Sequence, residues 1–419
     1  MKMKKIAVLS LSAAMCLSLA GCGSTPTTNE TKAKSEVVTT ETSHKEDEIH
    51  KIAVAIYDET DEQTNLFKDY YKNYLEQAFN VEFIYSSALQ SQEAVNNFIS
   101  EARKQGCEGV ISYANYDLEQ SIKACGDDLY YVVGSASFDE DTFNKLKSNK
   151  QFLGITGPST EEETNAGAKM IESLAGENGS AKKYLLLSGG SSEENFMHVS
   201  RTQGMLQTLV SNYGFELSTP VEEVSKIQEL TLVGKSKDGG EVYVCPGYYY
   251  NETDLVKTAL EQTKADVVAS TIAVSMLQDV IADQEKAQNR DIQVGTVDCF
   301  GDSNQEMFAK KDMFGNSSLN FVAGKCEAMA APSFIAMYNA ITGHADTVKD
   351  NGNAYSLNQD FWYASSLDDY KALRMKATNI YQNVYTTDDL MKNMSVYTDT
   401  ANFDTFKKLV EGLDSEKEA

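Results

Sequence analysis

Short apolar runs alternate with amphipathic stretches from Ile49 onward, and this alternation constrains the fold of the 419-residue chain more than any other feature. The first apolar runs cover residues 52–57, 81–85, 109–113, 129–133 and 152–156. Between two of them, segment 92–104 carries apolar residues at helical spacing. Near-continuous apolar strands separated by helices are typical of a parallel sheet covered on both faces.

The alternation of apolar runs and helical segments then starts again after residue 158. Ser159 and Thr160 stand three residues before Glu162 and Glu163, which is typical of a capping box opening a helix. Further strands are expected at 184–187, 266–270 and 292–297, and further helices at 194–212, 252–264 and 276–288. Two successive series of this kind predict an α/β protein with two doubly wound parallel-sheet lobes.

The first two dozen residues indicate export. Lys2, Lys4 and Lys5 precede an apolar run at 6–20 that is too short for a membrane-spanning helix. The run ends in Leu-Ala-Gly-Cys22, which resembles the lipobox of bacterial lipoproteins. The resemblance implies a signal peptide at 1–21, a lipid on Cys22 and an extracytoplasmic protein anchored to the cell membrane. Ordinary secretion with a free Cys22 is the alternative.

Residues 22–48 contain Ser, Thr, Glu and Lys with almost no large apolar side chain, so we expect a disordered tether. The net charge of −25 argues against binding to nucleic acid. The cysteines are odd in number and widely spaced, which is not a disulfide framework. Cys107 and Cys125 are the one pair with a plausible bridge, although buried thiols are the favoured interpretation.

Ligands of open parallel sheets bind beyond the carboxyl ends of the strands, so the residues there are the candidates for a binding site. They combine aromatic rings with amides, carboxylates and one arginine, a set that suits a neutral polar ligand with apolar faces, such as a sugar. The candidate ligand-binding residues are Tyr57, Phe67, Tyr113, Asn115, Ser135, Phe196, Arg201, Tyr249, Thr271, Asp298 and Asn320. Core packing is the competing interpretation for Tyr57, Phe67 and Phe196, and a surface ion pair is the competing interpretation for Arg201.

Enzyme chemistry finds less support. The chain has 4 histidines, and neither they nor the cysteines have metal-ligand spacing. Phosphate-binding glycine motifs and a nucleophile elbow do not occur. We therefore expect no metal, no cofactor and no catalysis, with a lipid-anchored hydrolase as a minor alternative.

Segments along the chain resemble the type I solute-binding lipoproteins of ABC importers, the class of the ribose- and galactose-binding proteins. Phe152 to Ser159 resembles the first crossover between lobes, Arg201-Thr-Gln-Gly204 resembles the Arg-x-x-Gly stretch, and Gly295 to Asp298 resembles the Gly-x-Asp strand end. The resemblance implies that Arg201 and Asp298 bind ligand and that Asn320 offers an amide. It also implies a monomer that passes a sugar to a membrane permease.

The same resemblance implies a three-segment hinge, expected near Gly157, Asp302 and Gly324. It places the first lobe at 49–158 plus 319–345. The second lobe is then 159–318 plus 346–419, including a C-terminal extension. Trp362 in this extension is expected to pack on the second lobe, with a reach into the cleft as the alternative.

Two departures from the family pattern bear on the ligand. Gly134-Ser135-Ala136 replaces the Asp-Arg pair of the ribose binders, and Thr271-Ile272 replaces their Asn-Asp. Recognition of the ribose kind is therefore in question. A nucleoside ligand, as in the basic membrane lipoproteins, and a role in presenting ligand to a membrane sensor remain open.

Overall fold

The computed structural model describes residues 49–114, 116–247, 252–378 and 384–413. The predicted signal peptide, the predicted lipidation site Cys22 and the predicted tether lie outside these residues, as do Asn115 and Tyr249. In the described part of the chain, no helix is both long enough and apolar enough to cross a membrane.

The first sheet has six strands in the order β13-β5-β4-β3-β1-β2. Every neighbouring pair is parallel, with Val54 of β1 opposite Ile111 of β3. The strands are β1 (His50–Ala55), β2 (Val81–Tyr85), β3 (Gly109–Ser112), β4 (Tyr130–Gly134), β5 (Phe152–Gly157) and β13 (Tyr355–Asn358).

The second sheet has eight strands in the order β14-β12-β11-β10-β6-β9-β8-β7. Its five central strands are parallel, whereas β14, β8 and β7 pair antiparallel at the edges. The strands are β6 (Lys183–Gly189), β7 (Glu216–Leu217), β8 (Thr231–Lys235), β9 (Glu241–Pro246), β10 (Val267–Ser270), β11 (Gln293–Cys299), β12 (Phe321–Lys325) and β14 (Trp362–Ala364).

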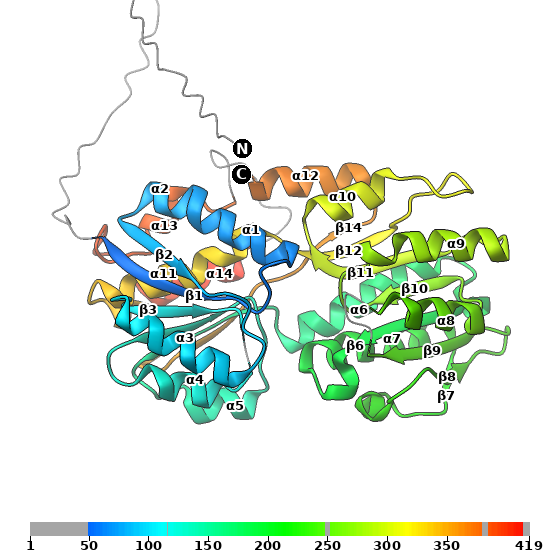
Figure 1. Ribbon diagram of the computed structural model, residues 1–419, viewed down its shortest axis with the longest axis horizontal. Helices are drawn as coiled ribbons and strands as arrows, with labels where there is room; N and C mark the ends of the chain where they lie inside the picture. Colours follow the sequence, from blue (N-terminus) through cyan, green and yellow to red (C-terminus); the bar gives the residue numbers. More distant parts are fainter. Residues whose placement is uncertain (1–48, 115, 248–251, 379–383, 414–419) are drawn as a thin grey trace, which may run out of the picture. The chain divides into compact units, whose positions relative to one another are not determined.

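Helices cover both faces of each sheet (Figure 1). Those of the first lobe are α1 (Glu62–Tyr70), η1 (Tyr71–Leu75), α2 (Glu76–Ala78), α3 (Gln92–Lys104), α4 (Leu118–Cys125), α5 (Glu140–Leu146), α11 (Ala331–Ile341), η7 (Ala345–Val348), α13 (Thr387–Met391) and α14 (Phe403–Glu411). Those of the second lobe are α6 (Thr160–Ala175), η2 (Gly179–Ala181), η3 (Gly190–Glu193), α7 (Phe196–Tyr213), η4 (Val221–Lys226), α8 (Thr253–Thr263), η5 (Ser275–Leu277), α9 (Gln278–Gln288), α10 (Asp302–Ala309) and α12 (Leu367–Thr378). The turn η6 (Glu327–Ala330) leads from β12 to α11.

Side chains on alternate strand positions enter different cores, which is why the strands are apolar throughout. Ile52 and Val54 of β1 join the cluster that contains α11, whereas Ala53 and Ala55 join the cluster that contains α3 and α4. Helix α11 is buried on all its sides until its last residue, so its sequence is apolar without amphipathic spacing. The predicted α/β class with two doubly wound lobes is confirmed.

The strand pairing differs from the predicted lobe boundaries at two places. Segment 319–345 was assigned to the first lobe, but β12 pairs with β11 in the second sheet. Segment 346–419 was assigned to the second lobe, but β13 pairs with β5 in the first sheet. Both strands come after the second series of units, where the order of apolar runs no longer tells which sheet a strand joins.

Three connections link strands of the two sheets: β5 to β6, β12 to β13, and β13 to β14. The crossover at Gly157 lies where it was predicted, and the one after Lys325 follows the predicted Gly324 closely. The prediction at Asp302 was wrong because α10 leads into β12 of the same sheet. The third crossover runs between Asn358 and Trp362 instead.

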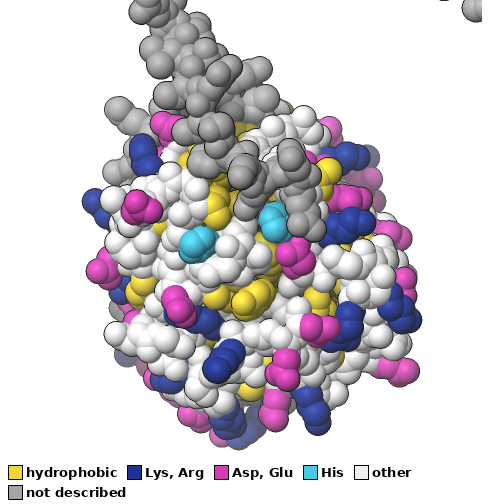
Figure 2. Space-filling view, turned by 90° about the vertical axis from the view of Figure 1, so that its left-hand side faces the viewer, with side chains coloured by type: hydrophobic (Ala, Val, Ile, Leu, Met, Phe, Trp, Pro, Cys, Tyr) yellow, Lys and Arg dark blue, Asp and Glu magenta, His cyan; other side chains and the backbone are white. Residues whose placement is uncertain are grey.

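The C-terminal extension packs rather than projects. Trp362 is buried, and its ring meets Phe300 edge-on with centroids 6.0 Å apart. Cys107 and Cys125 are free and buried, in agreement with the favoured interpretation. On the face shown in Figure 2, acidic and basic side chains are interspersed and apolar side chains form small groups, which is typical of a solvated surface.

Candidate functional site

Each sheet has one point where the chain order reverses, and ligands of open α/β sheets bind beside such points. In the first sheet this point lies between β1 and β3, and in the second sheet between β6 and β10. Tyr57 and Tyr113 follow the strands of the first pair. In the second sheet, β6 ends in Ser188 and Gly189, and Thr271 follows β10. The candidate site is therefore built from the carboxyl edges of both sheets.

On the first lobe, aromatic rings form a wall near the end of β3. Tyr113 stacks on Phe67 of α1 with ring centroids 4.8 Å apart. The hydroxyl of Tyr113 lies 2.7 Å from that of Tyr71, and burial raises the pKa of both phenols. Phe67 is buried and serves as packing behind Tyr113. The two rings touch each other, which leaves no space between them for a third ring.

Ser135 lies just beyond β4 in a strained position. Its φ of 54° is in the left-handed region, which a serine rarely adopts. Its buried hydroxyl has no hydrogen-bond partner, whereas its carbonyl oxygen accepts a hydrogen bond from Lys325 Nζ at 2.8 Å. Because Lys325 ends β12, this bond joins the two lobes.

On the second lobe, Arg201 of α7 is buried and held from two sides. Its Nε donates to Glu163 Oε2 at 2.5 Å, and its Nη1 donates to the carbonyl oxygen of Thr271 at 2.7 Å. Glu163 is also buried and lies 3.5 Å from the hydroxyl of Ser137 on the first lobe. The hydroxyl of Thr271 donates to the Leu187 carbonyl, so Thr271 braces β6 as well as Arg201.

Two glycines let α6 and α7 approach closely enough for this ion pair. A Cβ at Gly167 would overlap the carbonyl oxygen of Arg201, and a Cβ at Gly204 would overlap that of Thr164. Only glycine provides the required space at such a contact between helices.

His198 stands one turn before Arg201 on the same helix and is buried. Its Nδ1 accepts the N–H of Gly190 at 2.9 Å. Burial, together with the nearby charges of Arg201 and Lys325, lowers the pKa of His198 to about 3. The imidazole is therefore neutral and positions the loop after β6.

Asp298 lies on the other face of the second sheet, near the end of β11. It accepts a hydrogen bond from Asn304 Nδ2 at 2.7 Å. Burial raises its pKa to about 7, and the neighbouring Asp61 and Glu62 contribute to the increase. Asp298 binds Asn304 of α10 whereas Arg201 belongs to α7, and these two helices pack on opposite faces of the second sheet.

Asn320 lies at the wrong end of its strand for the predicted role. It precedes β12, its Oδ1 accepts the N–H of Val294, and its Nδ2 donates to the carbonyl of Ser317. The residue at the carboxyl end of β12 is Lys325. Tyr57 and Phe196 are half-buried, Tyr57 after β1 and Phe196 at the start of α7.

Sequence reasoning missed three residues of this region, namely Glu163, Lys325 and Phe361. Glu163 was assigned to a capping box, but the Ser159 hydroxyl accepts the Glu162 N–H while Glu163 binds Arg201. The ring of Phe361 lies 5.6 Å from the Arg201 guanidinium and 5.8 Å from Lys325 Nζ. A lysine ending an apolar strand is the signal that would have identified Lys325.

Solved structures with this architecture bind small solutes. A solute-binding protein of an ABC transporter from Bacillus halodurans C-125, with bound myo-inositol, matches with a TM-score of 0.58 at 14% identity, over 80% of this chain and 100% of that one. The arabinose-transporter binding protein of Shewanella sp. ANA-3 matches with a TM-score of 0.55 at 14% identity, over 78% and 95%. A carbohydrate-transporter solute-binding protein from Agrobacterium radiobacter, in complex with D-arabinose, matches with a TM-score of 0.56 at 9% identity. The match covers 79% of this chain and 99% of that one.

The chain has the type I periplasmic binding protein fold. Identities this low establish the fold and leave the ligand to be argued from the residues. No protein-family model matches the sequence. No curated protein matches it either.

In this type I fold, Glu62 of α1 caps a helix of the opposite lobe. Its carboxylate accepts the N–H of Asp302 at 2.5 Å and the N–H of Ser303 at 3.3 Å, and it also binds the Ser303 hydroxyl. A carboxylate at a helix N-terminus is stabilised by the helix dipole. Gly301 leaves the space that the Glu62 carboxylate occupies.

We expect Glu62→Ala to lower the free energy of unfolding by about 1 kcal/mol, because the first turn of α10 loses its acceptor. Glu59→Ala, at an exposed position of the same acidic stretch, should change it by less than about 0.5 kcal/mol. Urea titrations of both variants measure the difference. Equal losses in the two variants would show that Glu62 makes no specific contact to α10.

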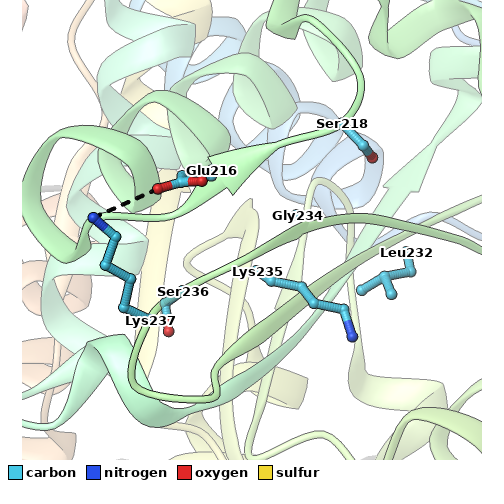
Figure 3. A pocket seen from close by; sticks show the side chains of 7 residues that line it. All are labelled: Glu216, Ser218, Leu232, Gly234, Lys235, Ser236 and Lys237. Carbon is cyan, nitrogen blue, oxygen red and sulfur yellow. Dashed lines mark ion pairs between the residues drawn. The ribbon is translucent and has the colours of Figure 1, made fainter.

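Two other features of this protein lie outside the candidate site. A hollow of about 380 Å³ lies beside β7 and β8. Figure 3 shows the side chains that line it, which are Glu216, Ser218, Leu232, Gly234, Lys235, Ser236 and Lys237. Its lining includes the exposed ion pair between Lys237 and Glu216 at 3.7 Å. Strand β9 separates β8 and β7 from the β6–β10 point, so we assign no ligand there.

Glu285, Asp291 and Asp312 form the one acidic group that could hold a metal ion in the described residues. Their carboxylates bind the surrounding chain. Glu285 Oε1 accepts a hydrogen bond from the N–H of Ile292. Asp291 Oδ2 accepts one from Nδ2 of Asn316, and Asp312 Oδ1 accepts one from the N–H of Asn316. We interpret the group as bracing the loop between α10 and β12.

Proposed function

We propose that the chain is the sugar-binding component of an ABC importer. One observation carries this proposal: the carboxyl edges of the two sheets meet through Lys325 and Ser135, with aromatic, hydroxyl and charged side chains gathered on both sides. The protein would hold one small solute between these edges and release it unchanged to a membrane permease. Solved proteins of the same fold bind arabinofuranose, myo-inositol and D-arabinose, which supports a carbohydrate ligand.

The location belongs to the same proposal. The lipobox-like sequence at Cys22 supports a lipid anchor on the outer side of the cell membrane, with 22–48 as the tether. A bilobal protein of this type closes around its ligand by bending at the crossovers, and ligand favours the closed form only through contacts made to both lobes. The crossovers after Gly157, after Lys325 and between Asn358 and Trp362 would provide the hinge.

A thermal-shift screen of the purified protein tests the function. Pentoses, hexoses, inositol, sugar acids and nucleosides are added at 10 mM, and the unfolding temperature is recorded. A ligand at about 100 times its Kd adds about 2.7 kcal/mol to the stability, which corresponds to a shift of several degrees. We expect a shift with at least one carbohydrate. A response to nucleosides alone would support a nucleoside-binding protein, and no response would contradict the proposal.

A further inference from the structure

Lys325 is a buried cation without a carboxylate partner. Its side chain is 6% exposed, yet the one hydrogen bond it makes to the described residues is to the carbonyl oxygen of Ser135. Burial lowers the pKa of Lys325 to about 8. A buried ammonium with a single neutral acceptor is unfavourable unless another group compensates its charge.

The two carboxylates whose charges act on the pKa of Lys325 have other partners. Glu163 forms the ion pair with Arg201, and Asp61 accepts the N–H of Thr64 as the N-cap of α1. Among the described residues, the ion pair of Glu163 is with Arg201 and not with Lys325. The positive charge therefore lies at the meeting point of the two sheet edges without an ionic partner.

Other groups around Lys325 are arranged for a ligand that carries both charge and hydroxyl groups. The Ser135 hydroxyl is buried without a partner, although its own carbonyl binds Lys325. Lys325 Nζ also lies over the ring of Phe361, 5.8 Å from its centroid, which places an aromatic side chain beside the cation. These three residues supply a cation, a hydroxyl and a ring within one small region.

We propose that the ligand is a sugar acid whose carboxylate pairs with Lys325 Nζ in place of the Ser135 carbonyl. This inference rests on the proposed sugar-binding function and names the substrate class. One ammonium without a partner matches the single charge of a carboxylate. A phosphate, with about two charges and three acceptor oxygens, would require further donors. The Ser135 hydroxyl and the Phe361 ring would then contact the sugar.

Isothermal titration calorimetry of the full chain with galacturonate, glucuronate, galactose and glucose tests the inference. We expect one acid to bind roughly 10- to 100-fold more tightly than its neutral parent sugar, the range typical of a hydrogen bond to a charged group. The primary amide of the same uronic acid has nearly the same shape without the charge and should bind as weakly as the parent sugar. This comparison needs no variant and is decisive even if substitution of Lys325 prevents folding.

The variant Lys325→Gln should abolish the preference for the acid over the amide. Lys349→Gln is the matched control. Lys349 is also buried, and it donates to the backbone carbonyl of Phe152, which lies at the amino end of β5 and so away from the candidate site. The control should retain the preference. Tight binding of a neutral sugar, with no gain from the acid, would overturn the inference and leave the proposed function intact. Failure of every sugar and sugar acid to bind would overturn both.

Discussion

Gly204→Ala should lower the free energy of unfolding by about 3 kcal/mol, although alanine in an open helix interior stabilises by about 1 kcal/mol relative to glycine. The added Cβ would overlap the backbone carbonyl of Thr164, and a backbone atom cannot move aside as a side chain can. Helices α6 and α7 would have to separate, which opens the core around Met170 and Met205. Chemical denaturation measures the loss.

Gln207→Ala is the control, because Gln207 is exposed on the same helix. It should change the stability by less than about 0.5 kcal/mol. A Gly204→Ala variant as stable as the wild type would show that α6 and α7 do not cross as closely as the structure indicates.

Arg201→Met should destabilise the protein by about 3–5 kcal/mol, because it leaves the carboxylate of Glu163 buried without its cation. The loss is expected without any ligand, since Arg201 is already bound by Glu163 and the Thr271 carbonyl. Thermal and urea denaturation of the ligand-free protein measure it.

The double variant Arg201→Met with Glu163→Gln should recover at least half of this loss, because both buried charges are removed together. Additive losses in the double variant would mean that the two side chains act independently. A single variant with unchanged stability but weakened sugar binding would mean that Arg201 serves the ligand alone.

The fold was predictable because its signal is local and repeated. The predicted bounds of α3 and of β2 match those of the structure, since each element is buried in a regular pattern along its own sequence. The assignment of β12 and β13 to the wrong lobes has a different cause. Which sheet a strand joins depends on pairing with residues far away in the chain, and apolarity alone does not report it.

The site was predictable only in part. Strand ends correctly placed Tyr113, Ser135, Thr271 and Asp298 at the carboxyl edges of the sheets. Asn320 was named from the family resemblance, but it precedes β12 and binds the backbone of Val294 and Ser317, whereas Lys325 ends the strand. The ion pair of Arg201 with Glu163 joins two helices through glycines, and no spacing in the sequence reveals such a contact.

A crystal structure of the protein with the sugar that gives the largest thermal shift tests the central claim most directly. We predict electron density for one sugar molecule between the ends of β4 and β12, within hydrogen-bonding distance of Ser135 and of at least one charged side chain of the second lobe. Density at the outer surface instead, with Lys325 still bound to the Ser135 carbonyl, would contradict the account.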